Sequence, residues 1–120
     1  MKRTAILMMV AAILMVALSG VALAATLTGT AGGDSLKGTS QADVLKGLGG
    51  DDLLQGFGGD DFLYGGPDSD KIYGGGGADW IVSEGDGKAD TVDCGSGVDA
   101  VKKSPTEQID RYVGCESFVS

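Results

Sequence analysis

Residues 47–82 read GLGGDDLLQGFGGDDFLYGGPDSDKIYGGGGADWIV, and this stretch decides the fold of the chain. It divides into four blocks of nine residues: GLGGDDLLQ, GFGGDDFLY, GGPDSDKIY and GGGGADWIV. Each block begins with glycine, has aspartate at its sixth place and a large aliphatic residue at its eighth. A fixed period of this kind predicts a repeat architecture, in which stacked neighbours bury one continuous core.

The same phase extends in both directions from this stretch. Toward the N-terminus it runs through GTSQADVLK (38–46) and GTAGGDSLK (29–37), with Leu27 nine residues before Leu36. Toward the C-terminus two residues, Ser83 and Glu84, interrupt it before GDGKADTVD (85–93) and CGSGVDAVK (94–102). The repeated aspartates are Asp34, Asp43, Asp52, Asp61, Asp70, Asp79, Asp90 and Asp99.

Each block predicts one turn followed by one short strand. Glycine accepts positive φ and suits the tight turn, and the residues after the aspartate are too few for a helix. Two blocks make one coil of 18 residues, so aliphatic residues stack into an internal ladder and strands pair in parallel. We therefore expect an all-β solenoid. The alternative is a disordered Gly/Asp-rich linker, but a linker would not keep an aliphatic residue at every ninth place.

The coil length predicts two rows of stacked carboxylates. Asp34, Asp52 and Asp70 fall in one row, and Asp43, Asp61 and Asp79 fall in the other. Carboxylates stacked at strand spacing repel one another unless a cation lies between them. The chain has no histidine, and oxygen-only ligands favour a hard ion such as calcium.

These blocks resemble the RTX, or haemolysin-type, calcium-binding repeat, whose nonapeptide is G-G-x-G-x-D-x-U-x. GGGGADWIV matches every defined position, whereas Asp68 and Gln41 replace the fourth glycine of their blocks. The resemblance is strong over 29–82 and weaker over 85–102. It implies a parallel β-roll over 25–102, with calcium held between turns by the repeated aspartates and by main-chain carbonyls.

All eight repeated aspartates are candidate calcium ligands under this resemblance. About four sites are best supported, between blocks one coil apart, and they pair Asp34/Asp52, Asp52/Asp70, Asp43/Asp61 and Asp61/Asp79. For Asp90 and Asp99 an ordinary role as solvated turn residues is an equal alternative.

Residues 1–24 are expected to be a secretory signal peptide. Lys2 and Arg3 precede an apolar run over 6–18, and Ala22-Leu23-Ala24 offers a small-residue cleavage site. The alternative is an uncleaved membrane anchor. Cleavage predicts an extracellular protein, free or associated with the cell surface, without a membrane segment of its own.

The two cysteines, Cys94 and Cys115, predict a disulfide in an exported chain, with two buried thiols as the alternative. They cannot form a zinc site without histidine. The bridge would hold the segment 103–120, expected to be irregular, as a cap whose Val113, Phe118 and Val119 cover the open end of the ladder.

Composition argues against nucleic-acid binding and against the common kinds of catalysis. Residues 25–120 carry 7 basic and 17 acidic residues, because Lys2 and Arg3 account for two of the nine basic ones, and this balance disfavours nucleic acid as a partner. The chain lacks the histidine base of common nucleophile systems and has no G-x-S-x-G or P-loop motif. We expect a non-enzymatic, secreted calcium-binding protein of the cell surface, matrix or adhesion type, with a polysaccharide or cell-surface partner. The alternative is a calcium-dependent accessory module of an extracellular hydrolase or polysaccharide-modifying enzyme.

Overall fold

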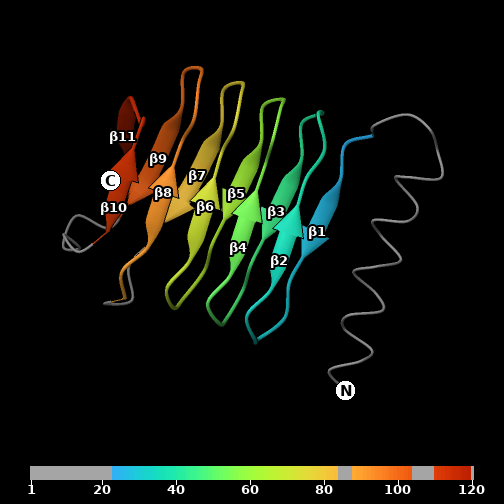
Figure 1. The fold of residues 1–120 in the computed structure, drawn as a ribbon, viewed down its shortest axis with the longest axis vertical. Helices are drawn as coiled ribbons and strands as arrows, with labels where there is room; N and C mark the ends of the chain where they lie inside the picture. The colour runs from blue at the N-terminus through green and yellow to red at the C-terminus, as the bar shows by residue number, and fades with distance from the viewer. Residues whose placement is uncertain (1–22, 84–87, 104–109, 120) are drawn as a thin grey trace.

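The computed structural model describes residues 23–83, 88–103 and 110–119, and these residues form a flattened all-β solenoid (Figure 1). Most strands have three residues and each follows a turn. The strands are β1 (Thr26–Thr28), β2 (Ser35–Lys37), β3 (Val44–Lys46), β4 (Leu53–Gln55), β5 (Phe62–Tyr64), β6 (Lys71–Tyr73), β7 (Trp80–Ser83), β8 (Thr91–Asp93), β9 (Ala100–Lys103), β10 (Arg111–Val113) and β11 (Ser117–Val119).

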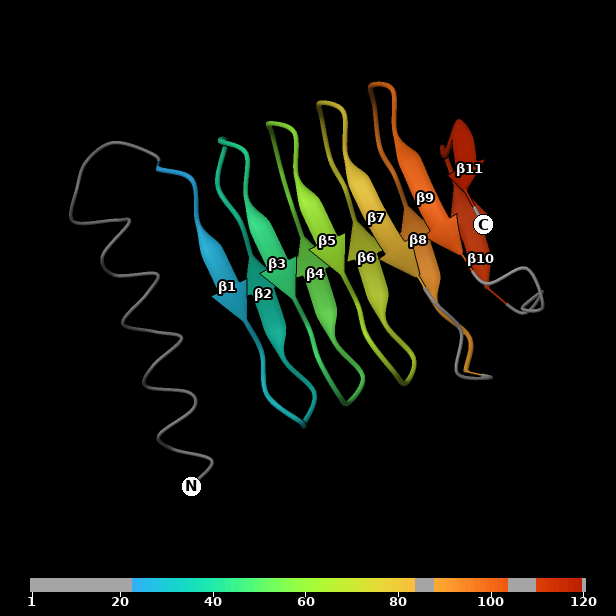
Figure 2. The same cartoon turned by 180° about the vertical axis from the view of Figure 1, so that it is seen from behind.

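The strands alternate between two parallel sheets. One sheet has the order β1-β3-β5-β7-β9-β11, and the other has the order β10-β8-β6-β4-β2. The two layers lie face to face, with turns projecting from both edges (Figures 1 and 2). Leu45 pairs with Leu63 and Leu54 with Ile72, so each coil in this part has 18 residues. The predicted all-β roll of 18-residue coils is confirmed.

The core is a ladder of one inward side chain per strand. A three-residue strand alternates its side chains, so only the middle residue points between the sheets. The ladder from Leu36 onward has no exposed surface, and its members are Leu36, Leu45, Leu54, Leu63, Ile72, Ile81, Val92 and Val101. Leu27 begins it at 6% exposure. The sequence predicted each of these positions.

The first change in coil length comes after β7. Lys71 pairs with Thr91 and Trp80 with Ala100, so two residues have been added and the register is kept. Ser83 extends β7 and is buried at 1% exposure, whereas Glu84 lies outside the described residues. The interruption in the period therefore starts at the end of β7, and the ladder keeps its register on both sides of it.

The segment after Lys103 is more regular than expected. Its described part adds β10 and β11, which pair in parallel with β8 and β9, so the roll continues through it. Tyr112 packs against the core, and its ring meets that of Phe118 edge-to-face at 5.2 Å. The three residues expected to cover the ladder, Val113, Phe118 and Val119, are all exposed, at 46%, 46% and 42%, and Tyr112 packs against the core in their stead.

Cys94 and Cys115 form a disulfide with 5.1 Å between their Cα atoms. Cys94 is fully buried in the core, and the bridge ties the segment between β10 and β11 to the coil beneath. The expected signal segment, 1–24, lies outside the described residues except for Leu23 and Ala24. Among the described residues no helix is long and apolar enough to span a bilayer.

Candidate metal centres in the glycine turns

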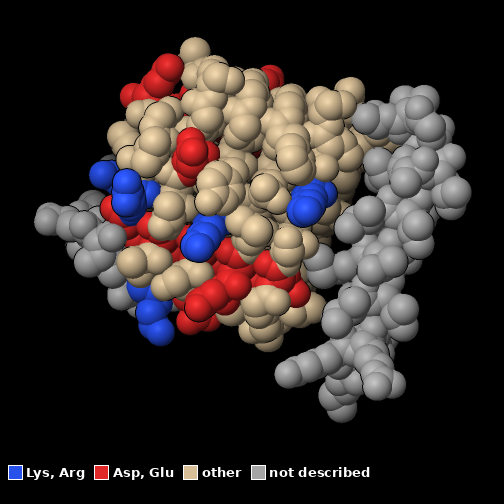
Figure 3. All heavy atoms as spheres, viewed as in Figure 1, with Lys and Arg blue, Asp and Glu red and all other residues tan. Residues whose placement is uncertain are grey.

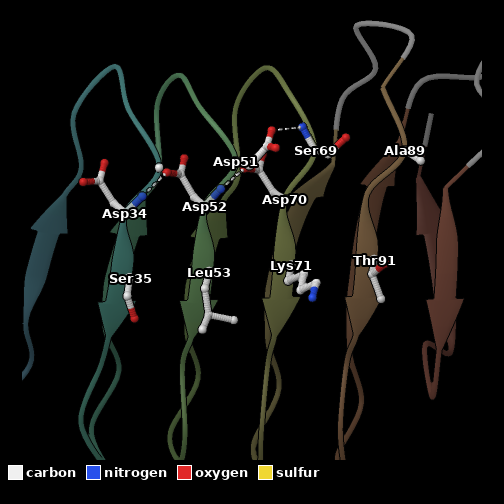
Figure 4. A pocket seen from close by; sticks show the side chains of 11 residues that line it. Asp34, Ser35, Asp51, Asp52, Leu53, Ser69, Asp70, Lys71, Ala89 and Thr91 are labelled. Atoms are coloured by element: carbon white, nitrogen blue, oxygen red, sulfur yellow. Dashed lines mark hydrogen bonds between the residues drawn. The ribbon is translucent and has the colours of Figure 1, made fainter.

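The repeated aspartates lie where each glycine turn enters its strand. Asp34, Asp52 and Asp70 precede β2, β4 and β6 in one row (Figure 4). The other row precedes the odd-numbered strands and consists of Asp43, Asp61, Asp79 and Asp99. From Asp43 onward these aspartates, Asp90 included, are at most 3% exposed. The structure thus assembles the two rows that the period predicted.

From Asp43 onward, one carboxylate oxygen of each repeated aspartate accepts a main-chain N–H from the coil before it. The main-chain N–H of Asp34 donates to Oδ1 of Asp52 at 2.8 Å, and that of Asp52 donates to Oδ1 of Asp70 at 2.9 Å. In the other row, the main-chain N–H of Asp43 donates to Oδ1 of Asp61, and that of Asp61 donates to Oδ1 of Asp79. The bond persists across the lengthened coil, from Asp79 to Asp99. Stacked carboxylates are therefore separated by an amide donor and do not face each other directly.

The second carboxylate oxygen has no hydrogen-bond partner in several turns. The buried, unpartnered Oδ2 atoms belong to Asp52, Asp61, Asp70, Asp79 and Asp99. Burying a carboxylate oxygen without a donor lowers the stability of the fold by roughly several kcal/mol unless a cation is present. These atoms are the strongest sign of a ligand in the described structure.

A main-chain carbonyl lies near the unpartnered oxygens of Asp52, Asp61 and Asp79. A Cβ atom added to Gly47 would contact both Oδ2 of Asp52 and, at 2.7 Å, the carbonyl oxygen of Gly65. At Gly74 the same test meets Oδ2 of Asp79 and the carbonyl oxygen of Cys94, each at 2.6 Å. A carboxylate and a carbonyl from the next coil therefore converge beside the first glycine of a block. That convergence also explains why glycine is needed there.

The donor set fits a calcium ion. Calcium prefers carboxylate and carbonyl oxygens and accepts irregular geometry. Within the described ranges no group of three or more Asp, Glu, His or Cys side chains gathers around one point. The donors that the turns bring together are one carboxylate and main-chain carbonyls, as at Asp52 and Asp79.

Burial raises the pKa values of the inward carboxyls. Desolvation is the largest cause, and neighbouring aspartates add repulsion. The pKa of Asp70 is raised to about 8, those of Asp52 and Asp79 to about 7, and that of Asp61 to about 6. The pKa of Asp99 is also raised, chiefly by burial. These groups resist carrying a charge unless a cation accompanies it.

Two features of the turns differ from the sequence expectation. Asp68, at a glycine place, keeps the left-handed turn with φ 73°, and its Oδ2 accepts the N–H of Gly50 at 2.9 Å. Aspartate tolerates this conformation better than most residues. Asp51 is exposed as expected, yet its Oδ1 accepts the N–H of Ser69 at 3.0 Å (Figure 4). Fifth-place aspartates thus also tie one coil to the next.

Asp110 was missed by the sequence analysis. Its Oδ1 accepts the N–H of Asp90 at 2.9 Å, which extends the first row by one member. Its Oδ2 accepts the hydroxyls of Tyr112 at 3.0 Å and Ser83 at 3.1 Å, so its surroundings differ from those of the inward carboxylates. The spacing of Asp110 from Asp90, equal to that of Asp90 from Asp70, and the aromatic residue two places later were the signals available.

The site and fold agree with the comparison to known families. The RTX calcium-binding nonapeptide repeat (4 copies) matches residues 28–56 and 55–87. The chain therefore belongs to the RTX calcium-binding repeat family, and it is a calcium-binding β-roll. Comparisons with curated proteins and with solved structures give no match.

Proposed function

We propose that this protein is an exported β-roll in which calcium is a structural ligand whose binding is coupled to folding. The observation that carries this proposal is the set of unpartnered, buried Oδ2 atoms. Each needs a positive partner, and beside Asp52, Asp61 and Asp79 a main-chain carbonyl supplies the second kind of ligand that calcium prefers. The proposed carboxylate ligands are Asp52, Asp61, Asp70, Asp79 and Asp99.

Asp90 has a different environment in the same row. Its Oδ2 lies 3.0 Å from the hydroxyl of Ser83, whose one proton is shared between Asp90 and Asp110, and this serine is one of the two added residues. We include Asp90 as a ligand that shares its carboxylate with Ser83. The glycine turn before Asp90 falls partly outside the described residues, so its carbonyls carry no part of this argument.

The proposed compartment is extracellular. RTX repeats suit calcium-rich surroundings, because extracellular calcium sites typically bind in the range of about 10⁻⁴–10⁻³ M. Residues 1–24 would be removed as a signal peptide, leaving Ala25 as the first residue. The Cys94–Cys115 disulfide supports an oxidising compartment. Intact mass before and after reduction tests both points, and a secreted chain that keeps Met1 would contradict cleavage.

The proposed duty is a non-catalytic one at the cell surface or in the matrix, with polysaccharide as the partner. An open groove of about 660 Å³ runs across β2, β4, β6 and β8. Its lining includes Asp51, Ser69, Lys71 and Thr91, whose polar groups suit sugar hydroxyls (Figure 4). Acidic side chains gather in a band on this face, beside scattered basic ones (Figure 3).

The alternative function is that of an accessory module of an extracellular enzyme. A binding experiment with the isolated protein distinguishes it from adhesion. Calcium-dependent retention of the isolated protein on polysaccharide or on cells supports adhesion. No retention, together with a calcium-dependent gain in activity of a co-purified hydrolase, supports the accessory role.

The ligand assignment is tested by counting ions. Asp61→Asn should lower the number of calcium ions bound per chain, because it removes the charge from a buried, unpartnered oxygen. Asp60→Asn is the matched control: this neighbour is exposed and its Oδ1 accepts the N–H of Ala78 at 2.8 Å. Equilibrium dialysis at saturating calcium gives the count, and equal counts for the two variants would contradict the assignment.

A further inference from the structure

The turns of the first coil differ from the later ones at the second place of the block. Thr30 and Thr39 occupy this place in the first two blocks, and neither has a positive φ. In the other described turns the residue at this place has φ between 67° and 87°. Those residues are Leu48, Phe57, Gly66, Gly75 and Gly95. The chain therefore contains two turn types, distinguished by threonine.

Threonine supplies the donors that the later turns lack. The N–H of Thr30 donates to Oδ2 of Asp34 at 2.5 Å, and its hydroxyl donates to the same oxygen at 3.0 Å. The hydroxyl of Thr30 also accepts the N–H of Gly32 at 3.2 Å, which closes the turn. One side chain thus binds both the carboxylate and the turn backbone.

The second block repeats this arrangement at the opposite edge. Thr39 donates its N–H to Oδ2 of Asp43 at 2.5 Å and its hydroxyl to Oδ1 at 2.9 Å, while the hydroxyl accepts the N–H of Gln41 at 3.0 Å. The N–H of Ala25 also donates to Oδ1 of Asp43 at 2.7 Å. Asp43 is 2% exposed, yet all its donors come from the protein.

The carboxylates divide along the same line as the turns. Every described block with a positive φ at its second place ends in an aspartate whose Oδ2 is buried and unpartnered: Asp52, Asp61, Asp70, Asp79 and Asp99. The two blocks with threonine end in aspartates whose Oδ2 is bound. Near Asp34 the carbonyl oxygen of Gly47 occupies the place that Gly65 takes near Asp52. The carboxylate and the carbonyl therefore lie close together in both turns. The two turns differ in the threonine donor, which is present at Asp34 and absent at Asp52.

We infer that Thr30 and Thr39 take the place of calcium in the first coil, so that Asp34 and Asp43 hold no ion there. This inference rests on the proposed function, because it assumes that the unpartnered carboxylates are the calcium ligands. An N–H and a hydroxyl give each of these carboxylates the donors that the unpartnered ones lack, so a cation is not needed to satisfy it. The sequence expectation counted Asp34 and Asp43 among the calcium ligands and paired Asp34 with Asp52 and Asp43 with Asp61.

The consequence is a coil at the N-terminal end of the roll that is complete without metal. β1, β2 and β3 flank these two turns and provide the edges onto which β4 and β5 pair. The metal-dependent part of the roll then begins at the turn that contains Leu48. A terminal repeat in a solenoid needs such a distinct closure, since it has a neighbour on one side only.

The test uses ion counts for two changes at the first turn. Asp34→Asn should leave the number of bound calcium ions unchanged, whereas Asp61→Asn should lower it. Thr30→Gly turns GTAGGD into GGAGGD, which has glycine at each defined place of the repeat, and should raise the count by about one. Ala31→Gly is the matched control: it adds the same backbone freedom one residue later, leaves the hydroxyl in place, and should leave the count unchanged.

Equilibrium dialysis at saturating calcium measures all four variants against the unaltered chain. A loss of an ion in Asp34→Asn, or no gain in Thr30→Gly, would overturn the inference. If Asp61→Asn loses no ion, the proposed ligands fail independently. Amide hydrogen exchange then tests the hydrogen bonds of the threonine turns without calcium counts. Slow exchange of the Thr30 and Thr39 N–H groups supports the inference, and fast exchange overturns it.

Discussion

At the residue scale, glycine is required where a turn stacks on the turn before it. Gly75 has φ 85°, and a Cβ atom there would collide with the carbonyl of Phe57 in the coil beneath. Gly76, its neighbour, has no such contact, since the nearest atom to its added Cβ is Oγ of Ser96 at 3.7 Å. Adjacent glycines in one block thus have different physical roles.

Gly75→Ala should therefore destabilise the calcium-loaded protein far more than Gly76→Ala. The left-handed conformation alone costs about 1–2 kcal/mol for a residue with a Cβ, and the collision with the Phe57 carbonyl adds to it. Urea unfolding at saturating calcium measures the difference. Equal midpoints for the two variants would show that the turns do not stack in this way.

The raised carboxyl pKa values predict how calcium binding depends on pH. The pKa of Asp70 rises to about 8 and that of Asp52 to about 7 in the folded, metal-free protein, from 3.8. Between the unfolded value of 3.8 and the raised values, the carboxyls of the folded state hold protons that the unfolded state has released. Metal-free stability therefore falls as the pH rises from about 4 to about 8.

Calcium needs the deprotonated carboxylates, so the starting state of the protein decides how many protons its binding releases. From the unfolded chain, whose carboxyls are already ionised at about pH 6, calcium binding should release almost no protons, whereas from a folded, metal-free roll it should release protons between about pH 4 and pH 8. Titration calorimetry in two buffers of different ionisation enthalpy counts these protons. Substantial proton release at about pH 6 would show that the metal-free roll is already folded and would contradict folding that depends on calcium.

At the element scale, each strand contributes one side chain to the core, so a single ladder residue carries much of its strand's packing. Leu54 is fully buried in β4, between the two sheets. The shortness of the strands leaves no second inward residue to compensate for its loss.

Leu54→Ala should lower the free energy of unfolding of the calcium-loaded protein by about 2–5 kcal/mol. Val98→Ala is the control, because Val98 is 70% exposed and truncation at the surface usually changes stability by about 0.5 kcal/mol or less. Denaturant unfolding at saturating calcium gives both values. A loss below about 1 kcal/mol for Leu54→Ala would contradict a one-residue ladder.

At the scale of the whole molecule, the roll has a thin core and a large entropic cost of ordering. The chain contains 22 glycines, which lose more backbone freedom on folding than other residues. Five carboxylate oxygens in the described structure are buried without partners. Without a cation, both facts oppose folding, and a domain of this size has little surplus stability to offset them.

Calcium should therefore switch folding of the whole roll. The β signal in circular dichroism and resistance to protease should appear together as calcium rises through about 10⁻⁴–10⁻³ M. Magnesium should act poorly, because it requires tighter octahedral geometry and retains its waters. A chelated sample at neutral pH with full β signal and full protease resistance would show instead that the fold is stable without metal.

The nine-residue period determined the architecture by itself. Asp, aliphatic and glycine places recur at one spacing, and only a coil of two blocks brings them into register. The ladder residues and the two aspartate rows followed directly, because each depends on position within the repeat. The disulfide was also predictable, since the chain contains two cysteines and no others.

Only the tertiary structure decided which carboxylate oxygens lack a partner. Asp34 and Asp52 occupy the same place in their blocks, yet one carboxylate is bound by Thr30 and the other is left with an unpartnered oxygen. Bound and unpartnered carboxylates divide with the φ angle of the residue at the second place of the block. A consensus sequence does not record that angle. Leu48 and Phe57 adopt this positive φ although each carries a Cβ, whereas Thr30 and Thr39, one coil earlier, do not.

The C-terminal strands were likewise settled in three dimensions. The period is lost after Lys102 in the sequence, and β10 and β11 are recognised by pairing with β8 and β9 across turns of unequal length. Hydrogen bonds between coils tolerate extra residues in a turn, whereas a fixed spacing along the chain does not. Repeat spacing therefore specifies the roll and its rows, while contacts between neighbouring coils decide where the roll ends and which turns need a metal ion.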